Sequence, residues 1–333
     1  MQELRKDPIL DRWVIISTER QKRPSDFLFY EKSNGDGGFC PFCEGNEDKT
    51  PDEITAIRNT ESRRNGPGWS LRVVPNRFPV LSVEEKLLKQ GEGLYDKISG
   101  VGAHEVIIET PCHSATLSTI SIPEFIDVLT TYRNRIADLK RDRRLKYVLV
   151  FKNHGISAGA SLEHSHSQLI ALPIVPKRVI EEIEGSERHY KYKERCIYCD
   201  IIHQEIPQQI RVVAENRDFI SLSPFAPTSP FETWILPKKH HSTFELFKDE
   251  GMENLARIFS ETLKKLDKAL DNPSYNFILH TSPFGMECIE YYHWHFEIMP
   301  KLTRTAGFEW GSGFYINPTS PEEATKFLRE AKI

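Results

Sequence analysis

The sequence carries one ordered series of elements twice. Each series contains a Cys-x-x-Cys pair, a strand-like run followed by a histidine, an amphipathic helix, a second strand-like run and a His-x-His pair. The single histidine and the His-x-His pair are separated by 51 residues in the first series (His113 to His164) and by 53 in the second (His240 to His293). This repetition predicts two copies of one α+β unit within a single chain, and two unrelated α+β domains are the alternative.

The length of the chain agrees with this division, because 333 residues correspond to about two domains. We place the first repeat at residues 1–173 and the second at 174–333. The segment 174–195 is charged and helix-prone, which predicts an ordered connector rather than a flexible linker. The stretch 44–69 is rich in Gly, Asp, Asn and Arg, and its composition predicts a surface loop.

Charge and hydropathy exclude several classes of function. The net charge is −4, so the chain has no surplus of cations for a nucleic acid or an acidic membrane surface. No apolar run approaches the roughly 18 residues of a membrane span, and the N-terminus lacks the apolar core of a signal peptide. We therefore expect a soluble, cytoplasmic protein that acts on small molecules, without a nucleic-acid or membrane partner.

Each repeat can close one metal site. In a long chain without an export signal, paired cysteines are more often metal ligands or redox centres than disulfides. Two thiolates and two imidazoles make a closed, structural zinc site. The predicted ligands are Cys40, Cys43, His113 and His164 in the first repeat, and Cys196, Cys199, His240 and His293 in the second.

This interpretation predicts about two zinc ions per chain. His241 is an alternative to its neighbour His240 as the fourth ligand of the second site, and the identity of the metal there stays open. A redox pair and an incidental spacing are the alternatives for each Cys-x-x-Cys. The two remaining cysteines, Cys112 and Cys288, are expected to be core residues without a chemical role.

The second histidine of the first His-x-His pair is the candidate nucleophile. Residues i and i+2 of a strand share a face, so His166 is expected beside the metal ligand His164. A neutral imidazole held in place attacks phosphorus well and leaves well afterwards. A Gly/Ser loop at 153–161 precedes the pair and offers N–H and hydroxyl groups to phosphate oxygens. A buried, hydrogen-bonded histidine is the alternative.

Many short stretches along the chain match one known family. They are Asp7 with Pro8, 13–16, Arg20, Arg23 with Pro24, 40–43, 74–79, 104–111, Asn153, Ser161, 164–168, 237–240 and 293–295. From about residue 5 to residue 329, the chain resembles the galactose-1-phosphate uridylyltransferase branch of the histidine-triad superfamily. The resemblance implies an α+β fold of two half-barrel repeats, each an antiparallel sheet with flanking helices. It also implies a homodimer and double-displacement chemistry.

The same resemblance implies roles for individual residues. His166 would accept a nucleoside monophosphate from a sugar nucleotide and become a nucleotidyl-histidine, while Gln168 would hold a phosphoryl oxygen. The positions expected near the nucleotide and its phosphates are Ser161, Asn76, Asn153, Arg20 and Arg23. Charge-assisted contacts of this kind stabilise the phosphoryl oxygens during transfer.

Two departures from the family pattern concern the substrate. Uridylyltransferases usually read His-Pro-His, whereas Ser165 stands between the two histidines here. The C-terminal region resembles nucleotide-sugar phosphorylases instead, which release ADP from ADP-glucose with phosphate as acceptor. Gly311, Ser312 and Gly313 could form an anion nest for such an acceptor, and a turn that requires glycine is the alternative.

Four functions follow from these observations. The first is uridylyl transfer from UDP-glucose to a hexose 1-phosphate such as galactose 1-phosphate. The second is an ADP-glucose phosphorylase, which transfers AMP to phosphate or a similar oxyanion. The third is a histidine-triad nucleotide hydrolase, and the fourth is a zinc-stabilised binding module without catalysis. The sequence alone leaves uracil and adenine, and the two kinds of acceptor, both open.

Overall fold

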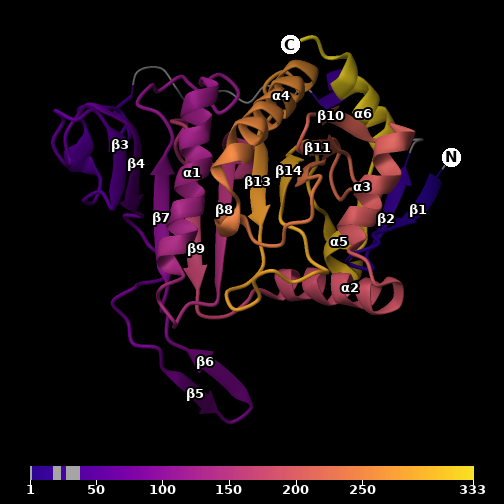
Figure 1. The fold of residues 1–333 in the computed structure, drawn as a ribbon, viewed down its shortest axis with the longest axis horizontal. Coiled ribbons are helices and arrows are strands. Elements are labelled where there is room, and N and C mark those ends of the chain that lie inside the picture. The colour runs from indigo at the N-terminus through magenta and orange to yellow at the C-terminus, as the bar shows by residue number, and fades with distance from the viewer. Residues whose placement is uncertain (1, 18–23, 28–37) are drawn as a thin grey trace.

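A computed structural model describes residues 2–17, 24–27 and 38–333 and is organised around one ten-stranded sheet (Figure 1). Each neighbouring pair of strands in this sheet is antiparallel. From one edge to the other the strands are β10 (Val212–Glu215), β11 (Phe219–Leu222), β12 (Thr233–Pro237), β14 (His295–Pro300), β13 (Tyr275–His280), β8 (Tyr147–His154), β9 (His166–Leu172), β7 (Ala103–Ile108), β4 (Trp69–Pro75) and β3 (Thr55–Arg58).

The strand order reads the same from either edge once the repeats are matched. Strands β3, β4, β7, β9 and β8 of the first repeat correspond to β10, β11, β12, β14 and β13 of the second, and β8 pairs with β13 at the centre. The registers correspond as well, because Gln168 pairs with Val106 and Glu297 pairs with Trp234. The predicted α+β fold with two repeated halves is therefore confirmed.

Two long helices, one from each repeat, cover one face of the sheet. They are α1 (Ile122–Leu139) and α4 (Met252–Leu270), which lie in front of the strands in Figure 1. Ser121 and Glu124 cap α1 reciprocally, as a capping box does. The helices meet at Phe125 and Phe259, whose ring centroids lie 5.3 Å apart. Most of the apolar core lies between these helices and the sheet.

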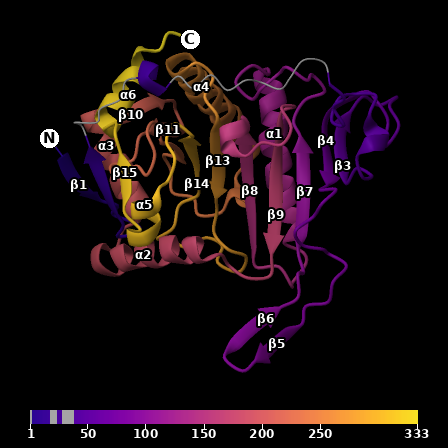
Figure 2. The same ribbon diagram turned by 180° about the vertical axis from the view of Figure 1, so that it is seen from behind.

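The opposite face of the sheet is covered unevenly. Helix α2 (Lys177–Lys193) and helix α3 (Ile197–Gln208) follow the first repeat, and Val179 and Ile183 of α2 share a buried cluster with Trp234 on β12. Seen from behind in Figure 2, α2 and α5 (Gly307–Ser312) lie beside the second repeat, whereas β8, β9 and β7 are in open view. Within the described ranges, the helices of this face therefore do not cover the strand that carries His166.

The remaining elements lie at the periphery. A small sheet joins the termini, because β2 (Trp13–Ser17) pairs with β1 (Gln2–Lys6) and with β15 (Tyr315–Asn317). The hairpin β5 (Lys89–Glu92) and β6 (Tyr95–Ile98) projects from the body (Figure 1). Helix α6 (Pro321–Glu330) ends the chain. The short 3₁₀ helices are η2 (Pro24–Phe27), η3 (Glu47–Lys49), η4 (Ile156–Ala158), η5 (Phe244–Leu246) and η6 (Asp249–Gly251).

Several local predictions can be compared with these elements. The expected ordered connector is confirmed, because most of 174–195 forms α2. The surface loop expected at 44–69 is wrong in part, since Thr55–Arg58 is the edge strand β3. Cys112 and Cys288 are exposed rather than in the core. The boundary between residues 173 and 174 stays a prediction.

Across the described part of the chain, none of the helices has the length and apolar character needed to cross a membrane.

Candidate functional site

His166 opens strand β9 on the face of the sheet that α1 and α4 leave free. Its side chain is buried, and its Nδ1 donates a hydrogen bond to the carbonyl oxygen of His164 at 2.8 Å. The ring of Phe42 lies edge-on, with the centroids 5.3 Å apart. Because Nδ1 carries the hydrogen, the lone pair is on Nε2. Burial and the Lys152 ammonium lower the pKa of His166, so the imidazole is held neutral and oriented.

His166 and Gln168 line a cavity of about 330 Å³. Phe42, Asn76 and Ser161 line the same cavity, so the structure brings His166 and Gln168 together with two of the five residues expected near the nucleotide and its phosphates. Asn153 lies outside it and lines a neighbouring, wider trough of about 600 Å³ on the same face of the sheet. Asn153 accepts a hydrogen bond from the amide of Asn276 at 2.8 Å. The substrate contacts themselves stay predictions.

Gln168 is oriented by a residue that the sequence analysis missed. Nδ1 of His104 accepts a hydrogen bond from the backbone N–H of Val80 at 3.4 Å, so the ring hydrogen is on Nε2. That nitrogen lies 2.9 Å from Oε1 of Gln168 and 3.1 Å from the amide nitrogen of Asn76. Since Nε2–H donates to Oε1 of Gln168, the amide hydrogens of Gln168 stay available to the cavity.

A buried ion pair supports the nucleophile strand from the helix side of the sheet. Lys152 lies 2.6 Å from Glu109, and its ammonium also donates to Ser165 Oγ at 3.0 Å and to the carbonyl oxygen of His166 at 2.9 Å. Glu109 accepts further hydrogen bonds from Ser165, Ser167 and Tyr132. Burial raises the pKa of Glu109, but Lys152 and the hydroxyls outweigh it and lower that pKa. Burial lowers the pKa of Lys152, while the Glu109 carboxylate opposes this and favours the ammonium form.

Ser165 has a structural use that a proline at this position could not supply. Its hydroxyl donates to Glu109 at 2.6 Å and accepts from Lys152. The departure from His-Pro-His therefore accompanies a buried polar network beneath the strand. The sequence did carry a signal for this network, because Glu109 and Lys152 are charged residues at the ends of strand-like runs.

The four predicted metal ligands of the first repeat lie together. Nδ1 of His164 is 3.6 Å from the sulfurs of both Cys40 and Cys43, and Nδ1 of His113 is 3.3 Å from Cys43. A tetrahedral zinc ion would separate a thiolate and an imidazole ligand by about 3.5 Å, so the donor set and spacing fit zinc. His164 donates through Nε2 to the carbonyl oxygen of Thr110 at 2.7 Å, which leaves Nδ1 free to coordinate.

The second repeat builds the same arrangement. Cys196, Cys199, His240 and His293 offer ligand atoms that all lie within 4.8 Å of one another. Cys199 is 3.6 Å from Nδ1 of His240 and 3.8 Å from Nδ1 of His293. His240, rather than His241, belongs to the cluster. In both histidines Nε2 donates to a backbone carbonyl oxygen. The two clusters could therefore each hold one metal ion.

A third group, which the sequence analysis missed, lies next to the second cluster. Glu182, His280 and His295 offer ligand atoms within 4.8 Å of one another. Burial opposes a charge on His280, but Glu182 and Glu297 outweigh it and raise its pKa to about 9. Sequence spacing could not reveal this group, since Glu182 is on α2 and the histidines are on β13 and β14.

Two further contact regions were predicted from the sequence. Arg20 and Arg23 lie outside the described residues. Gly311 and Ser312 end helix α5, and Gly313 follows it with a φ of 72°. The N–H of Gly313 donates to Glu309 and that of Phe314 to Ser312 Oγ. The segment has the form of a turn that requires glycine, and its contact with an anion stays a prediction.

Comparisons with known proteins match the whole chain. The family model described as "Galactose-1-phosphate uridyl transferase, N-terminal domain" matches residues 1–176, and that of the C-terminal domain matches residues 182–318. The chain is 39% identical to an ADP-glucose phosphorylase of Arabidopsis thaliana, over 99% of this chain and 93% of that protein. It is 31% identical to a galactose-1-phosphate uridylyltransferase of Thermotoga maritima, over 100% and 99%.

Solved structures of the same two kinds of enzyme align with the whole chain. A crystal structure of an ADP-glucose phosphorylase from Arabidopsis thaliana with bound ADP-glucose aligns with a TM-score of 0.84 at 36% identity, covering 100% of this chain and 99% of that one. A structure of a uridylyltransferase aligns with a TM-score of 0.77 at 30% identity, covering 99% and 98%.

Proposed function

Since the chain belongs to the galactose-1-phosphate uridylyltransferase family of nucleotidyltransferases, we propose that it transfers AMP from ADP-glucose to inorganic phosphate through His166. The observation that carries the transfer chemistry is the neutral imidazole of His166, oriented by the carbonyl of His164 beside an open cavity. A similarity of 39% over almost the full length to an ADP-glucose phosphorylase supports adenine as the base and phosphate as the acceptor.

The proposed reaction has two displacements. Nε2 of His166 attacks the α-phosphorus of ADP-glucose, an N–P bond forms, and glucose 1-phosphate leaves with the electron pair of the broken P–O bond. The positive charge that develops on the ring is shared with the His164 carbonyl through Nδ1–H. An oxygen of phosphate then attacks the same phosphorus, which releases ADP and returns the neutral imidazole.

The other residues of the site have supporting roles. The amide of Gln168, held by His104, donates to a phosphoryl oxygen as charge moves onto it. The Lys152 ammonium donates a hydrogen bond to the backbone carbonyl of His166 from the helix side of the sheet and so holds this backbone in place. Cys40, Cys43, His113 and His164 would hold a metal ion in the first cluster, and that ion would tie these segments to the start of the nucleophile strand.

Uridylyl transfer from UDP-glucose to a hexose 1-phosphate is the second candidate. The match of 31% over the full chain to a galactose-1-phosphate uridylyltransferase favours it. From the sequence alone this function is the first expectation, and the higher identity to an ADP-glucose phosphorylase supports placing it second. We also propose that the protein works as a homodimer and that its two Cys/His clusters hold zinc.

A labelling experiment distinguishes the candidates. The protein is incubated with ADP-glucose or with UDP-glucose, without an acceptor, and its intact mass is measured. We expect an AMP adduct from ADP-glucose, its loss as ADP when phosphate is added, and no adduct in His166→Ala. An adduct from UDP-glucose alone, discharged by galactose 1-phosphate, would establish the second candidate. Steady release of AMP without an adduct would establish the hydrolase.

A further inference from the structure

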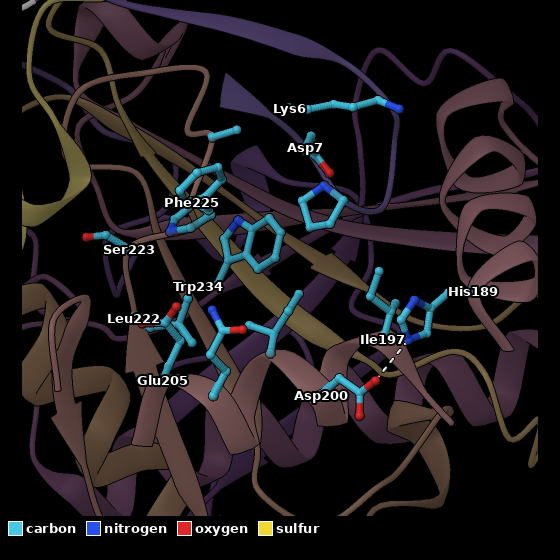
Figure 3. Close-up of a pocket in the computed structure, with 15 residues that line it drawn as sticks. Lys6, Asp7, His189, Ile197, Asp200, Glu205, Leu222, Ser223, Phe225 and Trp234 are labelled. Atoms are coloured by element: carbon cyan, nitrogen blue, oxygen red, sulfur yellow. Dashed lines mark hydrogen bonds and ion pairs between the residues drawn. The ribbon is translucent and has the colours of Figure 1, made fainter. Parts of the chain in front are cut away.

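A second cavity of about 500 Å³ lies in the second repeat, away from His166 (Figure 3). It is enclosed by the end of β1 at Lys6 and Asp7, by α3, and by the strands β11 and β12. Trp234 stands at its centre in Figure 3, with Phe225 on one side and the pair of His189 and Asp200 on the other. Nothing in the reaction proposed above uses this cavity.

The position of the cavity corresponds to that of the His166 cavity in the first repeat. There, Val74 of β4 pairs with Val106 of β7, and both residues line the cavity. In the second repeat, Leu222 of β11 pairs with Trp234 of β12, and both line the second cavity. Duplication has therefore produced two cavities on equivalent strands, of which one contains the proposed nucleophile.

The second cavity does not reach the histidine that corresponds to His166, and the histidine in its lining, His189, is paired with Asp200 at 2.9 Å. His295, the counterpart of His166, is 2% exposed and is absent from the cavity wall. The indole of Trp234 packs against it, with ring centroids 5.3 Å apart, where the first repeat has the much smaller Val106. A ligand in the second cavity would therefore meet an aromatic surface instead of a nucleophile, which allows binding without group transfer.

Glu205 gives the cavity an unused hydrogen-bond acceptor. This residue of α3 lines the cavity and is 4% exposed. Its Oε1 accepts two hydrogen bonds from Arg211, at 3.0 and 2.5 Å. Its Oε2 is buried and has no hydrogen-bond partner among the residues that the structure describes. A buried carboxylate oxygen without a donor is costly, and a ligand with an N–H group would satisfy it.

The walls indicate a flat and uncharged ligand. Trp234 offers an aromatic face, and Phe225 is held between the guanidinium groups of Arg5 and Arg211, 4.8 and 5.4 Å from its centroid. The carboxylates of the lining are each paired with an arginine, Asp7 with Arg12, Asp200 with Arg195 and Glu205 with Arg211, so the lining offers a phosphate no unpaired arginine. The one lysine of the lining, Lys6, is paired with Asp11 at 2.8 Å.

We propose that this cavity is a non-catalytic binding site for a nucleoside with an exocyclic amino group, such as adenosine, and without phosphate. The base stacks on Trp234, and its amino group donates to Glu205. The volume lies within the usual range for small-molecule sites, about 300–1,000 Å³. This site is independent of the transfer reaction, because it shares no lining residue with the His166 cavity.

The test compares variants at two neighbouring, exposed positions of α3. Gln204 lines the cavity and His203 does not. Adenosine binding to the full chain is measured by titration calorimetry without any sugar nucleotide. We expect the wild type and His203→Trp to bind one more equivalent of adenosine than Gln204→Trp, whose indole fills the cavity mouth. In Glu205→Gln the affinity for this equivalent should fall about tenfold or more, which corresponds to about 1.4 kcal/mol.

A second nucleoside tests the chemistry of the site. Uridine has no exocyclic amino group, so it should bind to the wild type and to Gln204→Trp with the same stoichiometry. Equal adenosine stoichiometry in the wild type and both tryptophan variants would overturn the proposal, as would uridine binding that Gln204→Trp removes. A chain that failed to transfer AMP would still bind this adenosine, so the two proposals fail separately.

Discussion

The ammonium nitrogen of Lys152 lies 2.6 Å from a carboxylate oxygen of Glu109, and both side chains are almost completely buried beneath the strand that begins with His166. A buried ion pair is rarely kept for stability alone, since desolvation offsets much of its attraction. Here the same ammonium reaches the backbone carbonyl of His166. The pair therefore links the core on the helix side of the sheet to the nucleophile on the opposite side.

The first prediction concerns this pair. Lys152→Met leaves Glu109 buried without its cation, which should lower the free energy of unfolding by about 3–5 kcal/mol. The loss of the contact to the His166 carbonyl should lower kcat by about tenfold to a hundredfold, whereas KM for the sugar nucleotide should change little, because Lys152 does not line the cavity. Urea unfolding and steady-state kinetics measure the two effects.

The double variant Lys152→Met with Glu109→Gln serves as the control. Removing both charges should restore at least 1 kcal/mol of the lost stability, but it cannot restore the contact to His166. If kcat recovered together with stability, the pair would act on the fold alone and would have no separate effect on the nucleophile.

The second prediction concerns His104, which we regard as a positioning residue. His104→Phe keeps a ring on β7 but removes the donor to Gln168, so Gln168 should lose its orientation and kcat should fall about tenfold. His104→Gln places an amide donor near the former Nε2 and should recover much of the rate. Steady-state kinetics of both variants measure the two values of kcat. Equal kcat in the two variants would contradict the role of the Nε2 hydrogen.

The third prediction concerns the metal content. Cys40→Ser and Cys196→Ser should each remove one metal ion per chain and lower the melting temperature, because each thiolate closes a four-ligand cluster. Cys112→Ser and Cys288→Ser are matched controls at exposed cysteines, and both should retain the full metal content. Elemental analysis of the purified variants identifies the metal and counts it. Unchanged content in Cys40→Ser would contradict the first site.

The sequence predicted the parts of this site that depend on local spacing. A Cys-x-x-Cys pair and a His-x-His pair are visible within a few residues, and their repetition predicted both clusters. The pair of Lys152 and Glu109 depends on three neighbouring strands and their register, because β8 and β7 both flank β9. Periodicity does not specify register, so the partner of each buried charge could not be derived from the sequence.

The same reasoning explains the errors at other positions. The edge strand Thr55–Arg58 is stabilised by pairing with β4, which overrides a loop-like composition in the surrounding segment. Glu182 meets His280 and His295 because α2 crosses the outer face of the second repeat. The segment was correctly expected to be ordered, but the face on which it packs depends on tertiary contacts between residues about a hundred positions apart.

The last prediction uses the symmetry of the two repeats. His295 occupies the position of His166 in the second repeat, yet its ring is stacked on His280 at 4.5 Å and is buried beside Trp234. Burial and His280 lower its pKa to about 3, so it is neutral as His166 is, but it lines neither the His166 cavity nor the second cavity. His295→Ala should therefore form the nucleotidyl adduct to the same extent as the wild type, with some loss of stability, whereas His166→Ala should form none.

Intact mass after incubation with the sugar nucleotide compares the two variants directly. Loss of the adduct in His295→Ala, with a native circular dichroism spectrum and an intact His166, would show that the second repeat takes part in the chemistry.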